Sequence, residues 1–430
     1  MAEEINDIMN KRTFIKGLAI AGISSPFSAI AMEDWIKKFE DIPALDLAED
    51  EVFWQGIRKG YRLKPDYINL ENGYYNFVPE EILEKYLAHI REVNYQGSYY
   101  MRTVQWENKK KIADKLAAML GCSGDELIIT RNTTESLDMI IGGFPWKAGD
   151  EAVFAEQDYG AMQDMFRQVS ERNNVVLRKV SVPNHPANDD EIVNLYASAI
   201  TDKTRLLMVC HMINITGQIL PIRKICDMAH QKGVQVMVDG AHAVAHIKFN
   251  MSDLNCDYYG ASLHKWLSVP LGAGILYVRK TNIKNIWPLI ADSVRKEDDI
   301  LRLNHIGTHP VATDLTIPDS IDYYNKIGPE RKEARLRYLQ LYWTEKVRSA
   351  PGVIINTPAD PARSCGIANV GIKGMKPALL AETLMKKYKV FTVAIDYANV
   401  QGCRITPNIY TTLGELDQFV IALKEMGASA

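Results

Sequence analysis

Short apolar segments alternate with segments of helical periodicity through the middle of this chain, and this alternation is the feature that most constrains its fold. Strands are predicted at 126–130, 152–155, 175–182, 205–210, 234–238 and 275–278. Helices are predicted at 109–120, from residue 133 onward, near 162–170 and at 222–231. Strands that alternate with helices form a largely parallel sheet with helices on both faces. The sequence therefore predicts an α/β fold.

The C-terminal part follows a different pattern. From about residue 320 helices dominate, followed by short strands at 366–372 and 390–393 and a terminal helix from Gly414. A chain of 430 residues is long enough for two domains. We therefore expect a second, smaller and less regular unit after the parallel sheet.

Composition and charge exclude several classes of protein. The net charge is −3 and there is no basic run for a nucleic acid to follow, so nucleic-acid binding is not expected. The sequence contains no apolar run of about 20 residues, which argues against stable membrane insertion. Its six cysteines are scattered without a CxxC pair, which favours small buried side chains over a disulfide framework.

Residues 1–31 have the organisation of an export signal. The segment 10–16 reads NKRTFIK, a weakly apolar stretch follows, and the small-residue triplet Ala29, Ile30 and Ala31 ends it. The pattern resembles a twin-arginine leader in which Lys11 stands at the position of the first arginine. It predicts a periplasmic or otherwise exported protein. The alternative is an ordinary amphipathic N-terminal helix on a cytoplasmic protein.

The stretch 260–274, GASLHKWLSVPLGAG, places Lys265 between a histidine and a tryptophan, just before a glycine-bounded turn. In a dry pocket a lysine amine loses its proton more readily and can attack a carbonyl. The alternative is a surface lysine whose stem lies over Trp266. Residues at the ends of the predicted strands decide between these interpretations.

Ligands bind at the carboxyl ends of the strands in an open parallel sheet. Residues 131–135 follow one strand and open a helix, which makes them either a phosphate seat or simply a helix cap. Asp239 ends a fully apolar strand, where a carboxylate needs a partner such as a protonated ring nitrogen. A lysine for a Schiff base and an acid facing a pyridinium nitrogen are the two groups that pyridoxal phosphate enzymes require. The ordered set predicts that cofactor.

The motifs VDGAH, SLHKW and GQILPI allow a family to be named. From about Tyr67 to the C-terminus the chain resembles a fold-type I pyridoxal phosphate enzyme of the class V aminotransferase family, in its isopenicillin N epimerase-like branch. The resemblance implies a large domain with a mostly parallel seven-stranded sheet flanked by helices, and a smaller α+β C-terminal domain. The expected boundaries are 32–74 for an N-terminal segment on the small domain, 75–310 for the large pyridoxal phosphate domain and 311–430 for the small domain.

The resemblance implies roles around the cofactor ring. Lys265 would form the Schiff base, Asp239 would pair with the pyridine nitrogen, and these two with His242 would be the catalytic residues. His242 would lie near the ring oxygen. Asn214 matches the position that hydrogen-bonds that oxygen. Tyr159 stands where the family places an aromatic residue or histidine over the ring; the alternative for it is an ordinary core tyrosine.

Further residues would hold the phosphate and the substrate. Thr133, Thr134, Ser262 and His264 would bind the phosphate. Thr308 matches a residue that reaches the phosphate of a neighbouring subunit, so the resemblance implies a homodimer with shared active sites.

The substrate would be an amino acid. Arg404, in GCRITPNIYTT, matches the arginine that holds a substrate carboxylate as a bidentate fork. Asn72 and Gly73 belong to the segment that lines the substrate pocket. The alternative for Arg404 is an ion pair that stabilises the fold.

Epimerisation or transamination at the α-carbon is the expected reaction, and a C–S lyase or cysteine desulfurase-like reaction is the alternative. The desulfurase branch carries a nucleophilic cysteine on an R-x-G-H-H-C loop. Here 394–402 reads AIDYANVQG, which we interpret as a short loop without that cysteine, and Cys403 is not its equivalent. A persulfide-forming desulfurase is therefore disfavoured.

Other functional classes receive less support. The pairs His242 with His246 and His305 with His309 have the i, i+4 spacing that can ligate zinc on a helix, but no HExxH motif accompanies them, so no metal is expected. A non-catalytic binding protein that kept the fold would lack Lys265 or the strand-end aspartate. GxGxxG and P-loop motifs are absent, which argues against dinucleotide or ATP chemistry.

Overall fold

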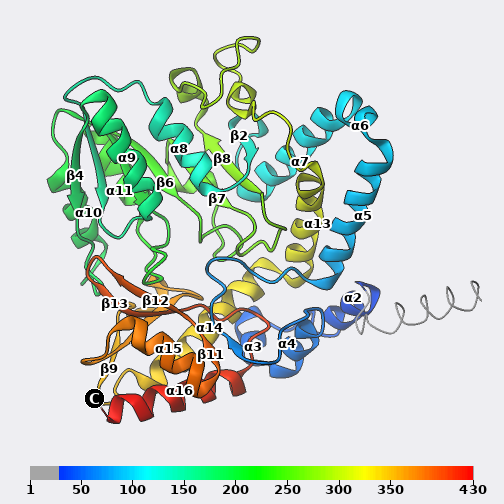
Figure 1. Cartoon of the computed structure of the whole chain (residues 1–430), viewed down its shortest axis with the longest axis vertical. Coiled ribbons are helices and arrows are strands. Elements are labelled where there is room, and N and C mark those ends of the chain that lie inside the picture. Colours follow the sequence, from blue (N-terminus) through cyan, green and yellow to red (C-terminus); the bar gives the residue numbers. More distant parts are fainter. Residues whose placement is uncertain (1–28, 430) are drawn as a thin grey trace, which may run out of the picture.

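A seven-stranded sheet is the centre of the computed structural model, which describes residues 29–429 (Figure 1). Its strands are β2 (Leu127–Thr130), β3 (Glu151–Ala155), β4 (Val176–Val180), β5 (Thr204–Cys210), β6 (Gln235–Asp239), β7 (Tyr258–Ser262) and β8 (Gly274–Val278). They lie in the order β2-β8-β7-β6-β5-β3-β4, and every neighbouring pair is parallel except those that β8 makes. The predicted α/β fold is confirmed. β8 is antiparallel because the connection from β7 contains no crossover helix.

Both faces of this sheet are covered. Ile128 of β2 packs in one apolar cluster with α8 (Thr133–Gly143) and α9 (Gly160–Asn173), whereas its neighbour Ile129 packs in another. Successive strand residues point to opposite faces, so each face has its own core. The second cluster is covered by α7 (Gln105–Leu120), α10 (Asp189–Ala199) and α11 (Ile222–Gln231), and the short α12 (Met251–Leu254) follows β6.

A group of long helices flanks the sheet. α13 (Val311–Ile327) packs against α7 and against α5 (Glu80–Gln96), and α6 (Ser98–Thr103) joins α5 to α7 (Figure 1). α7 ends at Gly121, as predicted, with φ +68°, a conformation that favours glycine. α5 was not predicted, because Ile82 is the only fully buried residue among its 17 and the apolar stripe is weak. The domain boundary at 310 stays a prediction.

The C-terminal part forms a smaller antiparallel sheet in the order β12-β13-β10-β9. Its strands are β9 (Val353–Ile355), β10 (Ala368–Ile372), β12 (Val393–Tyr397) and β13 (Val400–Ile405), and α14 (Pro329–Val347), α15 (Pro377–Tyr388) and α16 (Leu413–Ala428) pack with it. The interpretation of 394–402 as a loop was wrong. It forms most of the β12–β13 hairpin, whose turn is only Ala398 and Asn399.

The N-terminal segment packs on α13 and α14 and pairs with β11 (Val390–Phe391) in a separate two-stranded sheet. It contains α2 (Ala29–Lys37), α3 (Ala44–Glu49), α4 (Glu51–Arg58) and β1 (Ile68–Asn69), and β1 pairs in parallel with β11. Arg58 donates to both carboxylate oxygens of Glu415 at 2.9 and 2.8 Å. The expected export signal lies outside the described residues, apart from 29–31, which begin α2. Within 29–429 no helix is long and apolar enough to cross a membrane.

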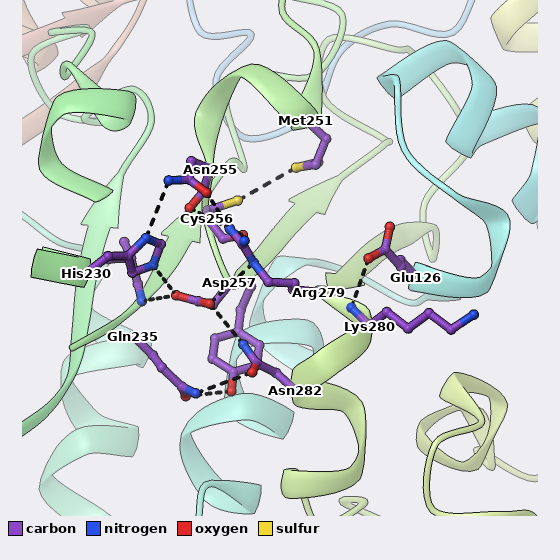
Figure 2. Close-up of polar contacts among 12 residues, drawn as sticks. Glu126, His230, Gln235, Met251, Asn255, Cys256, Asp257, Arg279, Lys280 and Asn282 are labelled. Carbon is purple, nitrogen blue, oxygen red and sulfur yellow. Dashed lines mark hydrogen bonds and ion pairs between the residues drawn. The ribbon is translucent and has the colours of Figure 1, made fainter. Parts of the chain in front are cut away.

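Figure 2 shows a polar cluster at the amino-terminal end of β7. The buried carboxylate of Asp257 lies 2.7 Å from His230 Nε2 and accepts hydrogen bonds from Val236 N at 2.8 Å and Asn282 Nδ2 at 2.9 Å. Arg279 Nε lies 3.4 Å from Oδ1, the same oxygen that accepts from Asn282. These contacts satisfy the hydrogen-bonding capacity of the carboxylate and hold together the amino-terminal ends of β6 and β7. Asp239 lies at the other, carboxyl-terminal end of β6.

Candidate active site

A cavity of about 350 Å³ lies at the carboxyl ends of β5, β6 and β7, where open parallel sheets bind ligands. Its volume is in the usual range for a small-molecule site. Every residue that the sequence suggested for the site lines this cavity, except Asn72 and Thr308. The lining residues among them are Gly73, Thr133, Thr134, Tyr159, Asn214, Asp239, His242, Ser262, His264, Lys265 and Arg404.

Lys265 contacts His242 in this cavity. Its Nζ lies 3.1 Å from His242 Nε2, and the indole N–H of Trp266 donates to His242 Nδ1 at 3.3 Å. An indole nitrogen can only donate, so Nδ1 is the acceptor and a neutral imidazole carries its proton on Nε2. Nε2–H then donates to Lys265, which requires a neutral amine. Burial lowers the pKa of Lys265 to about 8, which brings this neutral form within physiological reach.

The backbone around Lys265 is held by side chains from distant segments. Asn76 Nδ2 donates to the carbonyl of Lys265, and Lys332 Nζ donates to the carbonyl of Trp266. The Trp266 ring stacks on His246, with the ring centroids 3.7 Å apart. Lys332 is itself buried, which lowers its pKa to about 7. Sequence reasoning missed Asn76 and Lys332, because no local pattern links them to position 265.

Asp239 ends β6 with an incompletely satisfied carboxylate. Within residues 29–429 the carboxylate accepts one hydrogen bond, at Oδ1, from the backbone N–H of Ala241 at 2.9 Å. Burial raises the pKa of Asp239, because a charged carboxylate is unfavourable there. A cation at the other oxygen would relieve that cost, and the protonated ring nitrogen of pyridoxal phosphate is such a cation. The site therefore fits the ring of the expected cofactor.

The first turn of α8 fits the phosphate. Asn132 caps the helix, and Ser262 Oγ accepts a hydrogen bond from Thr133 N at 2.9 Å and lies 2.7 Å from Thr133 Oγ1. Thr134 also lines the cavity at this helix N-terminus, where backbone N–H groups favour anions. His264 Nδ1 is buried and lacks a hydrogen-bond partner in the described part of the chain. These groups can take up phosphate oxygens.

Cys210 and Asp158 form a buried pair that sequence reasoning missed. Cys210, in register with Asp239 on the neighbouring strand, donates from Sγ to Asp158 Oδ1 at 3.1 Å. Burial raises the pKa of Asp158 to about 7 and that of Cys210 well above its ordinary value. Cys210 therefore lines the cavity as a protonated thiol. Tyr159 also lines the cavity. It is 47% exposed, so it is not a core tyrosine.

Arg404 lies in the cavity, but its guanidinium is already paired. Nε and Nη2 donate to the two carboxylate oxygens of Glu71 at 3.2 and 2.6 Å, and Nη1 donates to the carbonyl of Asn214 at 3.4 Å. A Cβ at Gly73 would lie 2.8 Å from Arg404 Cζ, so this close approach needs glycine. Glu71 was not singled out in the sequence. It lies 333 positions from Arg404, and the two segments meet because residues 70–72 bond to Thr406 just beyond the pairing of β1 with β11.

Asn72 and Thr308 do not line the cavity of this single chain. Asn72 is fully buried and ties the N-terminal segment to β13: its N and Nδ2 donate to Oγ1 and O of Thr406 at 2.6 and 2.7 Å. Thr308 is exposed in the irregular stretch 305–310. Asn72 therefore positions its neighbours rather than contacting a ligand, and the role of Thr308 toward a second subunit stays a prediction.

The histidine pairs do not have helical geometry. Residues 241–246 form consecutive turns, so His242 and His246 do not share a helix face. His246 Nδ1–H donates to the carbonyl of His242 at 2.8 Å, and its Nε2 accepts from Gly366 N at 2.8 Å. In the other pair, His309 Nε2 lies 3.1 Å from Asp314. Among residues 29–429, no group of three or more potential metal ligands is found.

Residues 78–415 match a family model described as Aminotransferase class-V. The chain is 26% identical over 393 residues to an isopenicillin N epimerase from Streptomyces clavuligerus, covering 86% of this chain and 97% of the relative. It is 25% identical over 310 residues to a cysteine desulfurase from Haloferax volcanii, covering 68% and 71% respectively. Its fold is similar to that of an apo cysteine desulfurase from Thermococcus onnurineus NA1, with a TM-score of 0.76 and 19% identity over 87% of this chain and 98% of the other.

Proposed function

Because the chain belongs to the class V aminotransferase family, whose cofactor is pyridoxal phosphate, we propose that it acts at the α-carbon of an amino-acid substrate. The observation that carries this proposal is the contact between Lys265 and His242 in a cavity that also contains Asp239 and Arg404. These groups supply an amine that loses its proton near pH 8, a carboxylate for the ring nitrogen and a cation for the substrate. A non-catalytic binding protein has no need of all three.

When bound, pyridoxal phosphate withdraws electrons from the α-carbon of an attached amino acid and weakens the bonds to that carbon. We assign proton transfer at the α-carbon to Lys265 Nζ, whose lowered pKa suits a group that both accepts and returns a proton near neutral pH. His242, kept neutral by burial, orients that amine through Nε2–H. Asp239 keeps the ring nitrogen protonated, and Tyr159 would cover the ring.

Epimerisation or transamination is the reaction that we favour. The similarity to the Streptomyces clavuligerus isopenicillin N epimerase is 26% identity over 97% of that relative. A persulfide-forming reaction needs a reactive thiolate near the substrate. Five of the six cysteines are buried, the sixth, Cys122, is partly buried, and burial raises the pKa of all six thiols. The two-residue turn between β12 and β13 leaves no room for a cysteine-bearing loop there.

A C–S lyase reaction is the second candidate, supported by the cysteine desulfurase relatives. Incubating the holoenzyme with single amino acids in heavy water distinguishes the reactions. Deuterium at the α-carbon with racemisation identifies an epimerase, a 2-oxo acid identifies a transaminase, and pyruvate or alanine released from cysteine identifies a lyase. The Lys265→Ala variant is the control. Absence of exchange and of product with every amino acid would contradict the proposal.

We also propose a homodimer and export from the cytoplasm. The dimer is supported by Thr308, which the family resemblance assigns to the phosphate of a neighbouring subunit and which is exposed in this chain. Light scattering coupled to size exclusion tests the dimer, and a monomer would contradict it. Cell fractionation, with and without residues 1–31, tests the export signal.

A further inference from the structure

The ion pair between Glu71 and Arg404 occupies the position proposed for the substrate's carboxylate. The side chains are only 7% and 9% exposed, and both carboxylate oxygens of Glu71 accept from the guanidinium. The same forked geometry is the one by which an arginine holds a substrate carboxylate. Two carboxylates in one pocket therefore compete for one cation.

The surroundings of Glu71 allow its side chain, rather than its backbone, to move. The adjacent Asn72 is anchored on Thr406 by two hydrogen bonds, and its Oδ1 accepts from Tyr410 Oη at 2.7 Å. Tyr74, whose backbone N–H donates to Glu71 Oε1 at 2.9 Å, is 74% exposed and lines the cavity. Rotation of the Glu71 side chain past Tyr74 would take its carboxylate to solvent while the segment stays in place.

We propose that Glu71 is a specificity-determining residue that competes internally with the substrate's α-carboxylate for Arg404. This rests on the proposed function, because it presumes an amino-acid substrate. An incoming carboxylate replaces one anion by another, so Arg404 stays paired and the exchange is reversible. An amine without a carboxylate cannot displace Glu71, so the Glu71–Arg404 pair stays formed and presents no unpaired charge to that ligand. The apparent affinity for amino acids is lowered by the fraction of molecules in which the pair is closed.

The competing explanation is that the pair only ties the N-terminal segment to the small domain. A second bidentate pair, between Arg58 and Glu415, also joins the N-terminal segment to the small domain, but it lies outside the cavity. Glu415→Gln is therefore a matched control: it removes one carboxylate from an arginine between the same two parts of the chain. A purely structural role predicts the same effect on ligand binding for both variants.

The experiment compares alanine with ethylamine, which is alanine without its carboxylate. Both are titrated into holoenzyme, and the dissociation constant is taken from the change in the visible band of the cofactor. If the pair is closed in 90–99% of molecules, Glu71→Gln should tighten the binding of L- or D-alanine by roughly 10- to 100-fold. Ethylamine should change by less than about twofold, because it makes no use of Arg404. Glu71→Asp, whose shorter side chain reaches Arg404 less well, should fall between.

The outcomes separate the two proposals. Equal effects of Glu71→Gln on alanine and ethylamine, or no tighter binding of alanine in either Glu71 variant, would overturn the competition while leaving the enzyme's function intact. A wild-type protein whose visible band responds to neither probe would instead count against the proposed function. At one alanine concentration the thermal stability of Glu71→Gln should rise by more than that of the wild type, because tighter binding stabilises the folded protein more; an equal rise would count against the competition.

Discussion

Replacing Trp266 with phenylalanine should raise the pKa of Lys265. The indole N–H donates to His242 Nδ1 at 3.3 Å and thereby selects the imidazole tautomer that donates to a neutral lysine. A phenyl ring can still stack on His246 but cannot donate. A net hydrogen bond contributes about 0.5–1.5 kcal/mol, and 1.36 kcal/mol corresponds to one pKa unit, so the pKa should rise by about half a unit to one unit.

The assay is the rate at which apoenzyme takes up pyridoxal phosphate, followed by the visible band as a function of pH. Only the neutral amine reacts with the aldehyde, so the rate should rise with pH through about 8 in the wild type and at a higher pH in Trp266→Phe. Trp343→Phe is the matched control, because Trp343 is equally buried and its indole nitrogen has no hydrogen-bond partner within residues 29–429. Identical midpoints in Trp266→Phe and wild type would refute the tautomer argument.

Three further predictions concern single residues. Asp239→Asn should weaken cofactor binding and lower turnover by roughly 10²-fold or more, measured by equilibrium dialysis and steady-state kinetics, and near-normal activity would show that Asp239 is only structural. Arg404→Ala should lower kcat/KM for the amino-acid substrate by about 30- to 1000-fold, and Arg404→Lys by less, while the cofactor's visible band is unchanged; loss of that band would place Arg404 in cofactor binding. Burial lowers the pKa of Lys332 to about 7 from 10.5, so the unfolded chain binds that proton more tightly and stability rises with pH between these values. Urea unfolding of the holoenzyme should show that Lys332→Met removes about 3 kcal/mol of this gain between pH 7 and 9.5, and an unchanged pH slope would contradict the buried amine.

Most of the central sheet was predictable, because β2, β3, β5, β6 and β8 are almost entirely buried and appear in the sequence as short apolar runs. β6 is an example: four of its five residues are buried, and Asp239 ends it as predicted. β7 is also buried but was not among the predicted strands, because its sequence YYGAS is not an aliphatic run. α10 and α5 were missed, because each buries only one or two residues and so lacks a clear apolar stripe. The hairpin at 394–402 was missed for a related reason, since β12 has no fully buried residue.

The sequence by itself determined which residues gather at the carboxyl edge of the sheet. Parallel strands end at one edge, so Asp239, Ser262 and the start of α8 had to meet there, and Lys265 follows Ser262 by three positions. Only the tertiary structure decided what these groups are bonded to. Glu71 and Arg404 lie 333 positions apart, and their contact depends on how the N-terminal segment pairs with the small domain. Contacts of that kind arise from the packing of whole segments, so a local pattern of residue types cannot predict them.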